Sequence, residues 1–391
     1  MATPAVEATG FSAVPIGAFD RVLDRLRLPP GALRTIVLRA AAPAALVWLP
    51  LVIVDLLVAR APDPAAISFY QDLSVHVRFL IVVPLLVFAE LDIRRQTLLA
   101  AAGFALKGVV APEDRARFER AVAEGRRWSA SPIAEGLLVL AAAALMASLA
   151  RAAPADAVPF WFEVGPPGAA RLTPAGWWYM AGSTIPLFLI LRWGWRYAVW
   201  CRFLFHMARM PLRLTPTHPD KAGGLGFVGI GHTPFALIGA AVSCLLTATV
   251  GTRILHQGAT FESFQIELAA IVAIVTAIGL APMLLFLPAL ASVRRRGLLR
   301  HGEFSNRFVR DVEGRMWNAA EGGGAEVTGD DIQSLADLGT SYERVQEMRL
   351  VPVDVTDAVV FALAAGLPML VLILTNVPFE SVMKLLLSAV G

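Results

Sequence analysis

The side chains best suited to chemistry lie in one short stretch, TPTHPDKAGGLGFVGIGH, which runs from Thr215 to His232. His218, Asp220 and Lys221 bring an imidazole, a carboxylate and an ammonium group within four residues of one another. Five glycines follow between residues 223 and 231, and glycine allows backbone conformations and close approaches that other residues resist. The stretch therefore predicts either a structural turn or a ligand-binding loop.

Three interpretations of this loop are open. In the first, Pro219 sets a turn, Asp220 accepts backbone N–H bonds, and the glycines serve only the path of the chain. In the second, Lys221 and exposed glycine amides bind an anion such as a phosphate, a carboxylate or a lipid headgroup. A third, metal ligation, has the wrong spacing for any standard site, so we assign no metal. The candidate ligand-loop residues are His218, Asp220, Lys221, Gly223, Gly224, Gly226 and His232.

The usual motifs of soluble enzymes and cofactor domains are missing from the sequence. HPDK copies the tetrad of J-domain co-chaperones, but that module needs a soluble helical hairpin around it. Gly224, Gly226 and Gly229 fit the pattern GxGxxG, but no strand of a βαβ unit precedes them. No CxxC, HExxH, GxSxG or GxxxxGK[ST] motif occurs. We therefore predict no cofactor and assign no catalytic residue. The sequence favours a protein other than an enzyme over a lipid-modifying enzyme, which would need His218, Asp220 or His232 to converge with carboxylates.

A second group of polar residues lies beside apolar segments, where ionised side chains are costly and usually face a partner or a wet cavity. Its members are Asp55, Arg78, Glu90, Asp92, Glu135 and Glu267. One interpretation is pairing between helices or contact with lipid headgroups. The other is an ion or proton path, with Asp55 and Arg78 paired at one face of a membrane and Glu90, Asp92 and Glu135 forming an acidic mouth at the other.

The elements that must position these residues are membrane-spanning helices. Of the 391 residues, 57% are hydrophobic and only 17% are charged, which leaves too little polar surface to cover a soluble globule. A spanning segment must cross about 30 Å of hydrocarbon with its backbone hydrogen-bonded internally. We predict an all-α transmembrane bundle with seven spans, at residues 40–59, 77–93, 133–150, 176–191, 233–251, 266–293 and 358–377.

Basic residues support this number of spans and orient them. Of the 34 Lys and Arg residues, 28 fall in alternate loops, at 1–39, 94–132, 192–232 and 294–357. Because Lys and Arg concentrate in cytoplasmic loops, we predict a cytoplasmic N-terminus and a periplasmic C-terminal tail, residues 378–391. The pI of about 9.1 follows from this topology and from attraction to anionic lipid, so we predict no nucleic-acid partner.

Two of the cytoplasmic loops are long enough to fold into helices. Residues 112–114, Pro-Glu-Asp, are typical of a helix start. In the loop 294–357, a basic helix continues out of the sixth span, and Thr328 with Asp331 caps a second helix. We expect the apolar stripe of this second helix either to pack within the loop or to bind a cytoplasmic protein partner at residues 330–348. The stripe comprises Ile332, Leu335, Leu338, Tyr342, Val345 and Met348.

The block HPDKAGGLGF, which follows an Arg-rich aromatic helix, resembles a loop of uncharacterised bacterial polytopic membrane proteins of about this length. The resemblance implies a multi-pass protein of the bacterial inner membrane, with the lipid bilayer around it, and implies no activity. The number of spans and the near-membrane carboxylates favour a small-solute or ion transporter. The alternative is a membrane-anchored sensor or assembly protein whose cytoplasmic helices bind a partner. A continuous polar cavity from the outer face to Asp220 and Lys221 would favour the first function. An exposed apolar stripe at Leu335–Val345 together with a dry bundle would favour the second.

Overall fold

The computed structural model describes residues 33–58, 67–151, 161–164, 171–320 and 328–376. Within these ranges the protein is almost entirely helical, so the predicted all-α fold is confirmed. The two strands described there, β1 (Glu163–Val164) and β2 (Arg171–Leu172), form a short antiparallel ribbon. The predicted periplasmic tail, 378–391, lies outside the described residues.

The described helices follow in chain order. They are α3 (Leu33–Val58), η1 (Phe69–Gln71), α4 (Leu73–His76), η2 (Val77–Val82), α5 (Val83–Leu106), η3 (Pro112–Asp114), α6 (Arg115–Ser129), α7 (Pro132–Arg151), α8 (Pro174–Ala208), α9 (Gly226–His232), η4 (Thr233–Phe235), α10 (Ala236–His256), η5 (Phe261–Ser263), α11 (Gln265–Leu280), η6 (Ala281–Phe286), α12 (Leu287–Ala320), α13 (Gly329–Gln346) and α14 (Val355–Asn376).

Five helical stretches in the described part of the chain are long and apolar enough to cross a membrane. They are Leu73–Leu106, Pro132–Arg151, Gly226–His256, Gln265–Trp317 and Val355–Leu372. The predicted spans 40–59 and 176–191 fall on α3, which holds a shorter apolar stretch, and on α8, which carries arginines in its second half. The protein is therefore a multi-pass membrane protein with at least these five candidate spans.

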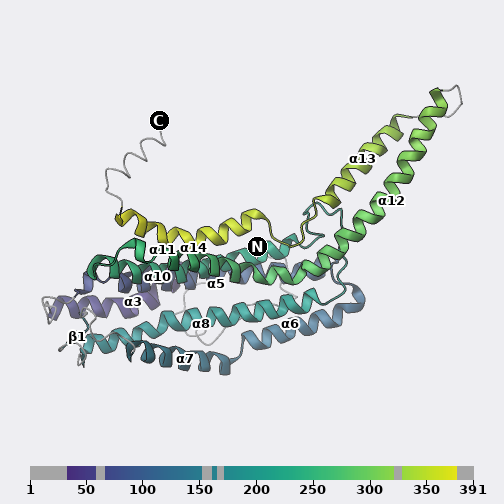
Figure 1. Ribbon diagram of the computed structural model, residues 1–391. Coiled ribbons are helices and arrows are strands. Elements are labelled where there is room, and N and C mark those ends of the chain that lie inside the picture. The colour runs from purple at the N-terminus through teal and green to yellow at the C-terminus, as the bar shows by residue number, and fades with distance from the viewer. Residues whose placement is uncertain (1–32, 59–66, 152–160, 165–170, 321–327, 377–391) are drawn as a thin grey trace.

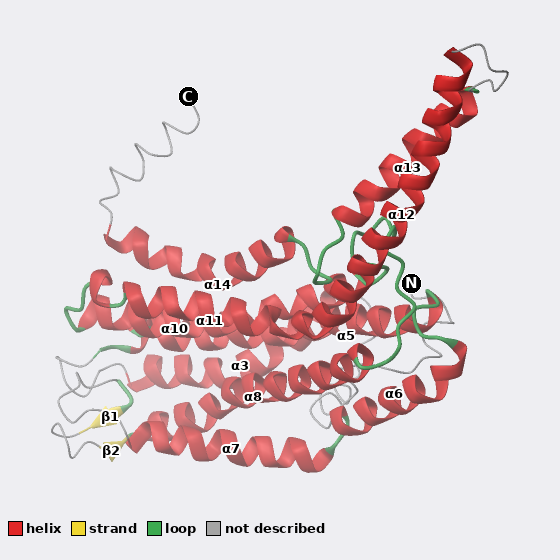
Figure 2. Ribbon diagram, turned by 45° about the vertical axis from the view of Figure 1, so that its right-hand side comes forward, coloured by secondary structure: helices red, strands yellow, loops and turns green. Residues whose placement is uncertain are grey.

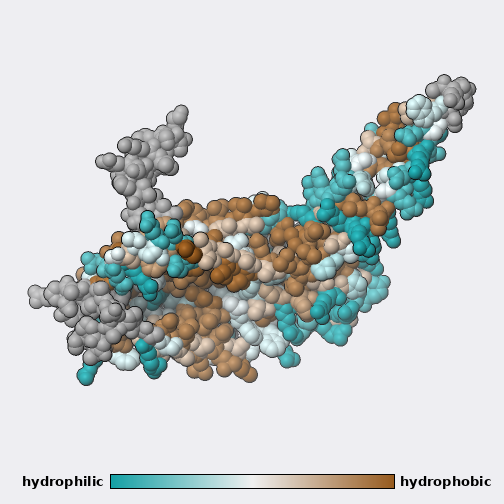
Figure 3. Space-filling view, in the orientation of Figure 1, coloured by the Kyte–Doolittle hydropathy of each residue, from teal (hydrophilic) through white to brown (hydrophobic). Residues whose placement is uncertain are grey.

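The long helices lie side by side in an elongated bundle, and α12 and α13 leave one end of it as a hairpin (Figure 1 and Figure 2). We call this the hairpin end, and the end with β1 and β2 the ribbon end. On the face shown in Figure 3, hydrophobic residues cover the middle of the bundle and hydrophilic residues surround the start of the hairpin. An apolar belt between polar ends is the distribution that a bilayer imposes on a helical bundle.

Prolines explain two interruptions in the long helices. Pro84 lacks the N–H group that would bond the carbonyl of Leu80, and the residues before it form the π-helical segment η2. Pro282 lacks the donor for the carbonyl of Ile278, and the chain passes through the 3₁₀ segment η6 before α12 begins. At membrane depth a carbonyl released in this way must find a donor on another element.

An aromatic cluster packs the elements of the hairpin end around Phe104 of α5. Its ring centroid lies 5.9 Å from that of Phe203 on α8, 5.1 Å from that of Phe227 on α9 and 6.4 Å from that of Phe286 on η6. Phe104, Phe203 and Phe286 are at most 1% exposed. Edge-on and offset aromatic contacts of this kind fix the elements on either side of the loop that contains HPDK.

The hairpin closes through its own side chains. Thr328 and Asp331 form the capping box that the sequence predicts, with the Asp331 carboxylate 3.0 Å from the Thr328 backbone nitrogen. Asp331 also receives two hydrogen bonds from the Arg315 guanidinium of α12, at 2.8 and 3.1 Å. In the apolar stripe of α13, Val345 is fully buried close to Gly297 of α12. At Val345 the stripe thus packs against α12, whereas Ile332 at its start is 60% exposed.

Candidate functional site

The loop at residues 215–225, called the HPDK loop below, is organised around the carboxylate of Asp220. Its Oδ1 accepts hydrogen bonds from the backbone N–H groups of Ala222 (2.8 Å) and Gly224 (3.1 Å), and its Oδ2 accepts one from Gly226 (2.8 Å). Successive backbone amides of this kind form a cradle for an anion. Here the anion inside the cradle is the side chain of Asp220 itself.

Three residues of the HPDK loop adopt the left-handed backbone region. Lys221, Gly223 and Gly224 have φ angles of 54°, 65° and 97°. Glycine reaches this region without a steric cost, whereas the Cβ of Lys221 makes it unfavourable there. The turn at Lys221 is held by its N–H bond to the carbonyl of His218 (3.1 Å) and by His218 Nδ1, which lies 2.8 Å from Asp220 Oδ1.

The segment that follows α13, residues 347–354, closes over this turn and is called the clasp segment below. The Lys221 ammonium lies 2.6 Å from the carboxylate of Glu347. Arg349 donates its backbone N–H to the Lys221 carbonyl (2.6 Å) and its guanidinium to the Asp220 carbonyl (2.7 Å). The base of the hairpin is therefore bonded to the HPDK loop through backbone and side-chain groups together.

The electrostatics of Asp220 follow from this geometry. Burial by itself raises the pKa of the carboxyl, but the N–H bonds from Gly226, Ala222 and Gly224 outweigh it and hold the pKa below its usual value of 3.8. Asp220 is therefore ionised at neutral pH. Because these amides bond Asp220 and Lys221 pairs with Glu347, the geometry favours the structural interpretation of the loop over the binding of an external anion.

His232, the last residue of α9, has other partners. It is fully buried, its Nδ1 accepts the indole N–H of Trp200 (3.1 Å), and its Nε2 is hydrogen-bonded to the carbonyl of Gly279. The proton consequently resides on Nε2, and the imidazole caps a carbonyl at the break before Pro282. Among the described residues, no group of three His, Cys, Asp or Glu side chains is placed to hold a metal ion.

Two of the predicted carboxylates belong to a buried charge network on α5, α7 and α8. The guanidinium of Arg196 lies 3.0 Å from Glu90, and that of Arg192 lies 3.4 Å from both Glu90 and Glu135. The side chains of Arg192 and Arg196 are 3% and 2% exposed, and those of Glu90 and Glu135 are 16% and 13% exposed. Two positive and two negative charges thus meet inside the bundle, so Glu90 and Glu135 pair between helices, as in the first of the two interpretations, and do not form a purely acidic mouth.

Sequence reasoning missed the two arginines of this network. Arg192 and Arg196 stand beyond the fourth predicted span and count there as cytoplasmic loop charges. In the structure α8 continues without a break to Ala208, and residues four apart lie on the same helical face. The spacing Arg-x-x-x-Arg opposite the carboxylates of Glu90 and Glu135 is the signal that identifies the network.

The structure does not bring the other predicted ionisable residues together. Arg78 donates to the hydroxyl of Tyr179 (2.7 Å) and to Ser183 (3.0 Å) on α8. These contacts attach Arg78 to α8, and among the described residues its guanidinium forms no ion pair with Asp55.

Two further residues of the predicted path lie on other helices, α5 and α11. Asp92 is half-buried on α5, and Glu267 is exposed in the first turn of α11. At that position the negative charge of the Glu267 carboxylate interacts favourably with the positive end of the α11 helix dipole. The role expected for Glu267 at an interface is compatible with this placement.

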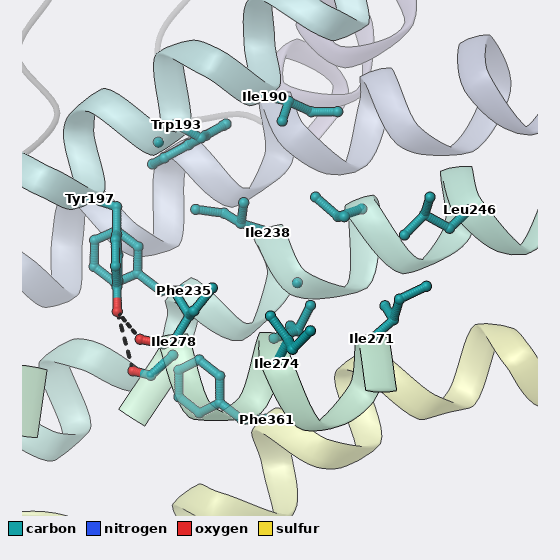
Figure 4. A pocket seen from close by; sticks show the side chains of 15 residues that line it. Ile190, Trp193, Tyr197, Phe235, Ile238, Leu246, Ile271, Ile274, Ile278 and Phe361 are labelled. Carbon is teal, nitrogen blue, oxygen red and sulfur yellow. Dashed lines mark hydrogen bonds between the residues drawn. The ribbon is translucent and has the colours of Figure 1, made fainter. Parts of the chain in front are cut away.

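A cavity of about 430 Å³ lies between α8, α10, α11 and α14, and Figure 4 shows its lining. We call it the interhelical cavity. Its walls are aliphatic and aromatic side chains such as Ile190 and Ile274. At one end the hydroxyl of Tyr197 donates to the carbonyl of Ile278 (2.6 Å), which Pro282 leaves without its helical donor. Sequence reasoning missed this cavity because it depends on the packing of four helices, although Pro282 marks the break.

The fold and these sites define a helical, multi-pass membrane protein with paired charges between its helices and a helical hairpin at one end. No protein-family model, no curated protein and no solved structure matches the chain. The resemblance of the HPDKAGGLGF block to a family of bacterial membrane proteins stays a prediction.

Proposed function

We propose that this chain is a seven-span protein of the bacterial inner membrane that holds a protein partner in the cytoplasm through the α12–α13 hairpin. The observation that carries the proposal is the set of large apolar side chains that the hairpin exposes. Phe304, Met316, Trp317 and Ile332 are 55%, 51%, 71% and 60% exposed. Exposed large apolar side chains on a projecting element are typical of interaction sites.

The topology in this proposal adds α3 and α8 to the five candidate spans. α8 extends over 35 residues, about 52 Å at the helical rise, which is more than a hydrocarbon core requires. With seven crossings, the hairpin, the HPDK loop and α6 share the side on which basic residues concentrate. The positive-inside rule makes that side cytoplasmic.

The charges of the hairpin describe the kind of partner. α12 exposes a row of arginines beside its apolar side chains, at Arg295, Arg296, Arg300, Arg307 and Arg310. A partner with an acidic amphipathic helix would match both the charge and the apolar side chains.

A lipid surface fits the far end of the hairpin less well. Trp317 lies 23 residues beyond Arg294 on the same helix, about 35 Å along its axis. In Figure 1 the hairpin extends away from the bundle. A protein in the cytoplasm is therefore the occupant that we assign to the exposed apolar side chains.

The bundle itself supports assembly over transport. The interhelical cavity is lined by apolar side chains, and the charges of Glu90, Glu135, Arg192 and Arg196 are paired with one another. In the described part of the chain, neither the apolar cavity nor the paired charges provide a polar path across the bundle to the HPDK loop. A bundle with an apolar cavity and paired charges, together with a projecting hairpin, fits a membrane-anchored assembly protein.

The test is photocrosslinking in living cells with a photoreactive amino acid at Met316. We expect a covalent adduct with one protein partner, which disappears when Arg307→Glu and Arg310→Glu reverse the charge of α12. Arg120→Glu reverses an equally exposed charge on α6 and should leave the adduct unchanged. Adducts formed only with lipid, only with a second copy of this chain, or regardless of the charge of α12 would contradict the proposal.

Transport of a small solute or ion is the second candidate function. Two observations favour it: the π-helical and 3₁₀ interruptions at η2 and η6, and the charge network beside α5. Broken helices and buried ionisable groups often surround the substrate sites of transporters. A solute flux into proteoliposomes that Glu90→Gln abolishes would favour this function over assembly.

A further inference from the structure

We infer that the interhelical cavity binds one acyl chain of a membrane phospholipid, held alongside α8. This inference is independent of the proposed partner of the hairpin. It rests on the chemistry of the cavity lining, on the way the cavity opens and on a glycine that leaves its space free.

The chemistry of the cavity admits hydrocarbon and disfavours water. Its lining is aliphatic and aromatic, and its polar end is already satisfied. The hydroxyl of Tyr197 donates to the carbonyl of Ile278, and His232 Nε2 is hydrogen-bonded to the carbonyl of Gly279. A buried water needs two to four polar partners, and a cavity without them stays dry. The occupant that suits such a space is an apolar chain.

The cavity opens towards the surroundings of the bundle through α11. Ile274 and Ile278 line it and are nevertheless 55% and 58% exposed. Both belong to the stretch Gln265–Trp317, one of the candidate membrane spans. In a bilayer these side chains face acyl chains, so the cavity is continuous with the lipid around the protein.

A missing side chain on α8 keeps the space open. Gly194 lines the cavity, and a Cβ placed on it would meet no atom within 4 Å. Figure 4 shows Trp193 and Tyr197 on the same stretch of α8, with Leu246 and Ile271 further along the cavity. Because helices in lipid associate chiefly through van der Waals packing, an empty space here would forfeit contacts that an acyl chain restores.

The experiment uses the full chain in nanodiscs of phosphatidylethanolamine and phosphatidylglycerol with a trace of phosphatidylcholine that carries a diazirine in one acyl chain. After illumination, labelled peptides are quantified by mass spectrometry. We expect the label to concentrate on Leu246, Ile271 and Ile274, above its level on Leu137 and Leu140, which are exposed on α7. Those α7 residues report ordinary contact with the surrounding lipid.

A filling variant makes the test specific. Gly194→Phe places a ring in the open space, and labelling of the cavity residues should fall to the level of α7. Gly136→Phe is the matched control, because a Cβ at this exposed α7 glycine also meets nothing within 4 Å. Thermal unfolding of both variants checks their folding, and Gly194→Leu gives a second, smaller filling.

Three results would overturn the inference. One is equal labelling of the cavity and α7 in the unaltered chain, which would mean surrounding lipid only. Another is cavity labelling that persists in folded Gly194→Phe and Gly194→Leu. Labelling by a free diazirine fatty acid that exceeds labelling by the phospholipid would also contradict it, because the occupant would then be another lipid.

Discussion

Asp220 and His232, two of the candidate ligand-loop residues, both bond backbone groups of this chain. The Asp220 carboxylate accepts three N–H groups, and His232 bonds the carbonyl of Gly279. Buried polar groups must find such partners, since an unpaired one costs roughly 1–3 kcal/mol. At this scale the polar side chains of the loop stabilise an irregular path of the chain between α8 and α9.

The substitution Asp220→Asn tests this role. It removes the charge and places an NH₂ group against at least one of the backbone donors, so we expect a loss of about 1–3 kcal/mol in the free energy of unfolding. Unfolding in detergent, followed by intrinsic fluorescence, measures it. Glu347→Gln breaks an exposed ion pair of the same loop and should cost less.

The stability difference between the unaltered chain and Asp220→Asn should depend on pH, because the pKa of Asp220 is lowered in the folded protein. Its contribution to stability is fully present above the usual value of 3.8 and is lost as the pH falls through the lower, folded-state pKa. The stability gap between the unaltered chain and Asp220→Asn should therefore be constant near neutral pH and shrink in acid. A gap that grows in acid would contradict the assigned role.

The helices are joined by contacts of two kinds. Van der Waals packing operates along their full length, as around Phe104, whereas the buried charges join α5, α7 and α8 at one level. α7 lies at the edge of the bundle, and Glu135 supplies its ionic contact with α8. At the scale of elements, the network specifies which face of α8 meets α5 and α7.

A double-mutant comparison tests the network. Glu90→Gln removes one negative charge and leaves an excess of buried arginine, which should cost about 3–5 kcal/mol in unfolding free energy. Combining it with Arg196→Met removes one charge of each sign and leaves Arg192 with Glu135. We therefore expect the double variant to be more stable than Glu90→Gln alone, as measured by unfolding in detergent. Strictly additive losses would show that the charges act independently.

The whole molecule combines an apolar bundle with polar ends of different character. The ribbon end carries short turns, and the hairpin end carries the HPDK loop, the clasp segment, α6 and the hairpin. The clasp bonds of Arg349 make the hairpin and the HPDK loop one unit.

The proposed orientation can be checked with single cysteines in a chain whose Cys201 and Cys244 are replaced by alanine. Gln257→Cys lies between α10 and α11, and Ser334→Cys lies on α13, and both positions are exposed. A membrane-impermeant thiol reagent should label Gln257→Cys in spheroplasts and Ser334→Cys only after the membrane is opened. The reverse pattern, or labelling of both in intact spheroplasts, would refute a cytoplasmic hairpin.

Several features of the protein were predictable from the sequence because they depend on neighbouring residues and on hydropathy. The all-α fold follows from apolar segments that can satisfy their backbone in lipid only as helices. The capping box of Thr328 and Asp331 spans four residues, and the glycines of the HPDK loop lie where positive φ is required. The break at Pro282 is local in the same sense, because proline lacks an N–H group.

The tertiary structure alone decided which of these groups meet. Arg192 and Arg196 stand in a basic segment of the sequence, yet they are buried because α8 brings them opposite Glu90 and Glu135. The amides that the HPDK loop offers are occupied by its own Asp220, and the interhelical cavity exists only where four helices pack around Gly194. Such contacts join residues far apart in the chain. The free energy of burying a charge, or of leaving a cavity between helices, depends on which side chains the neighbouring helices place beside it.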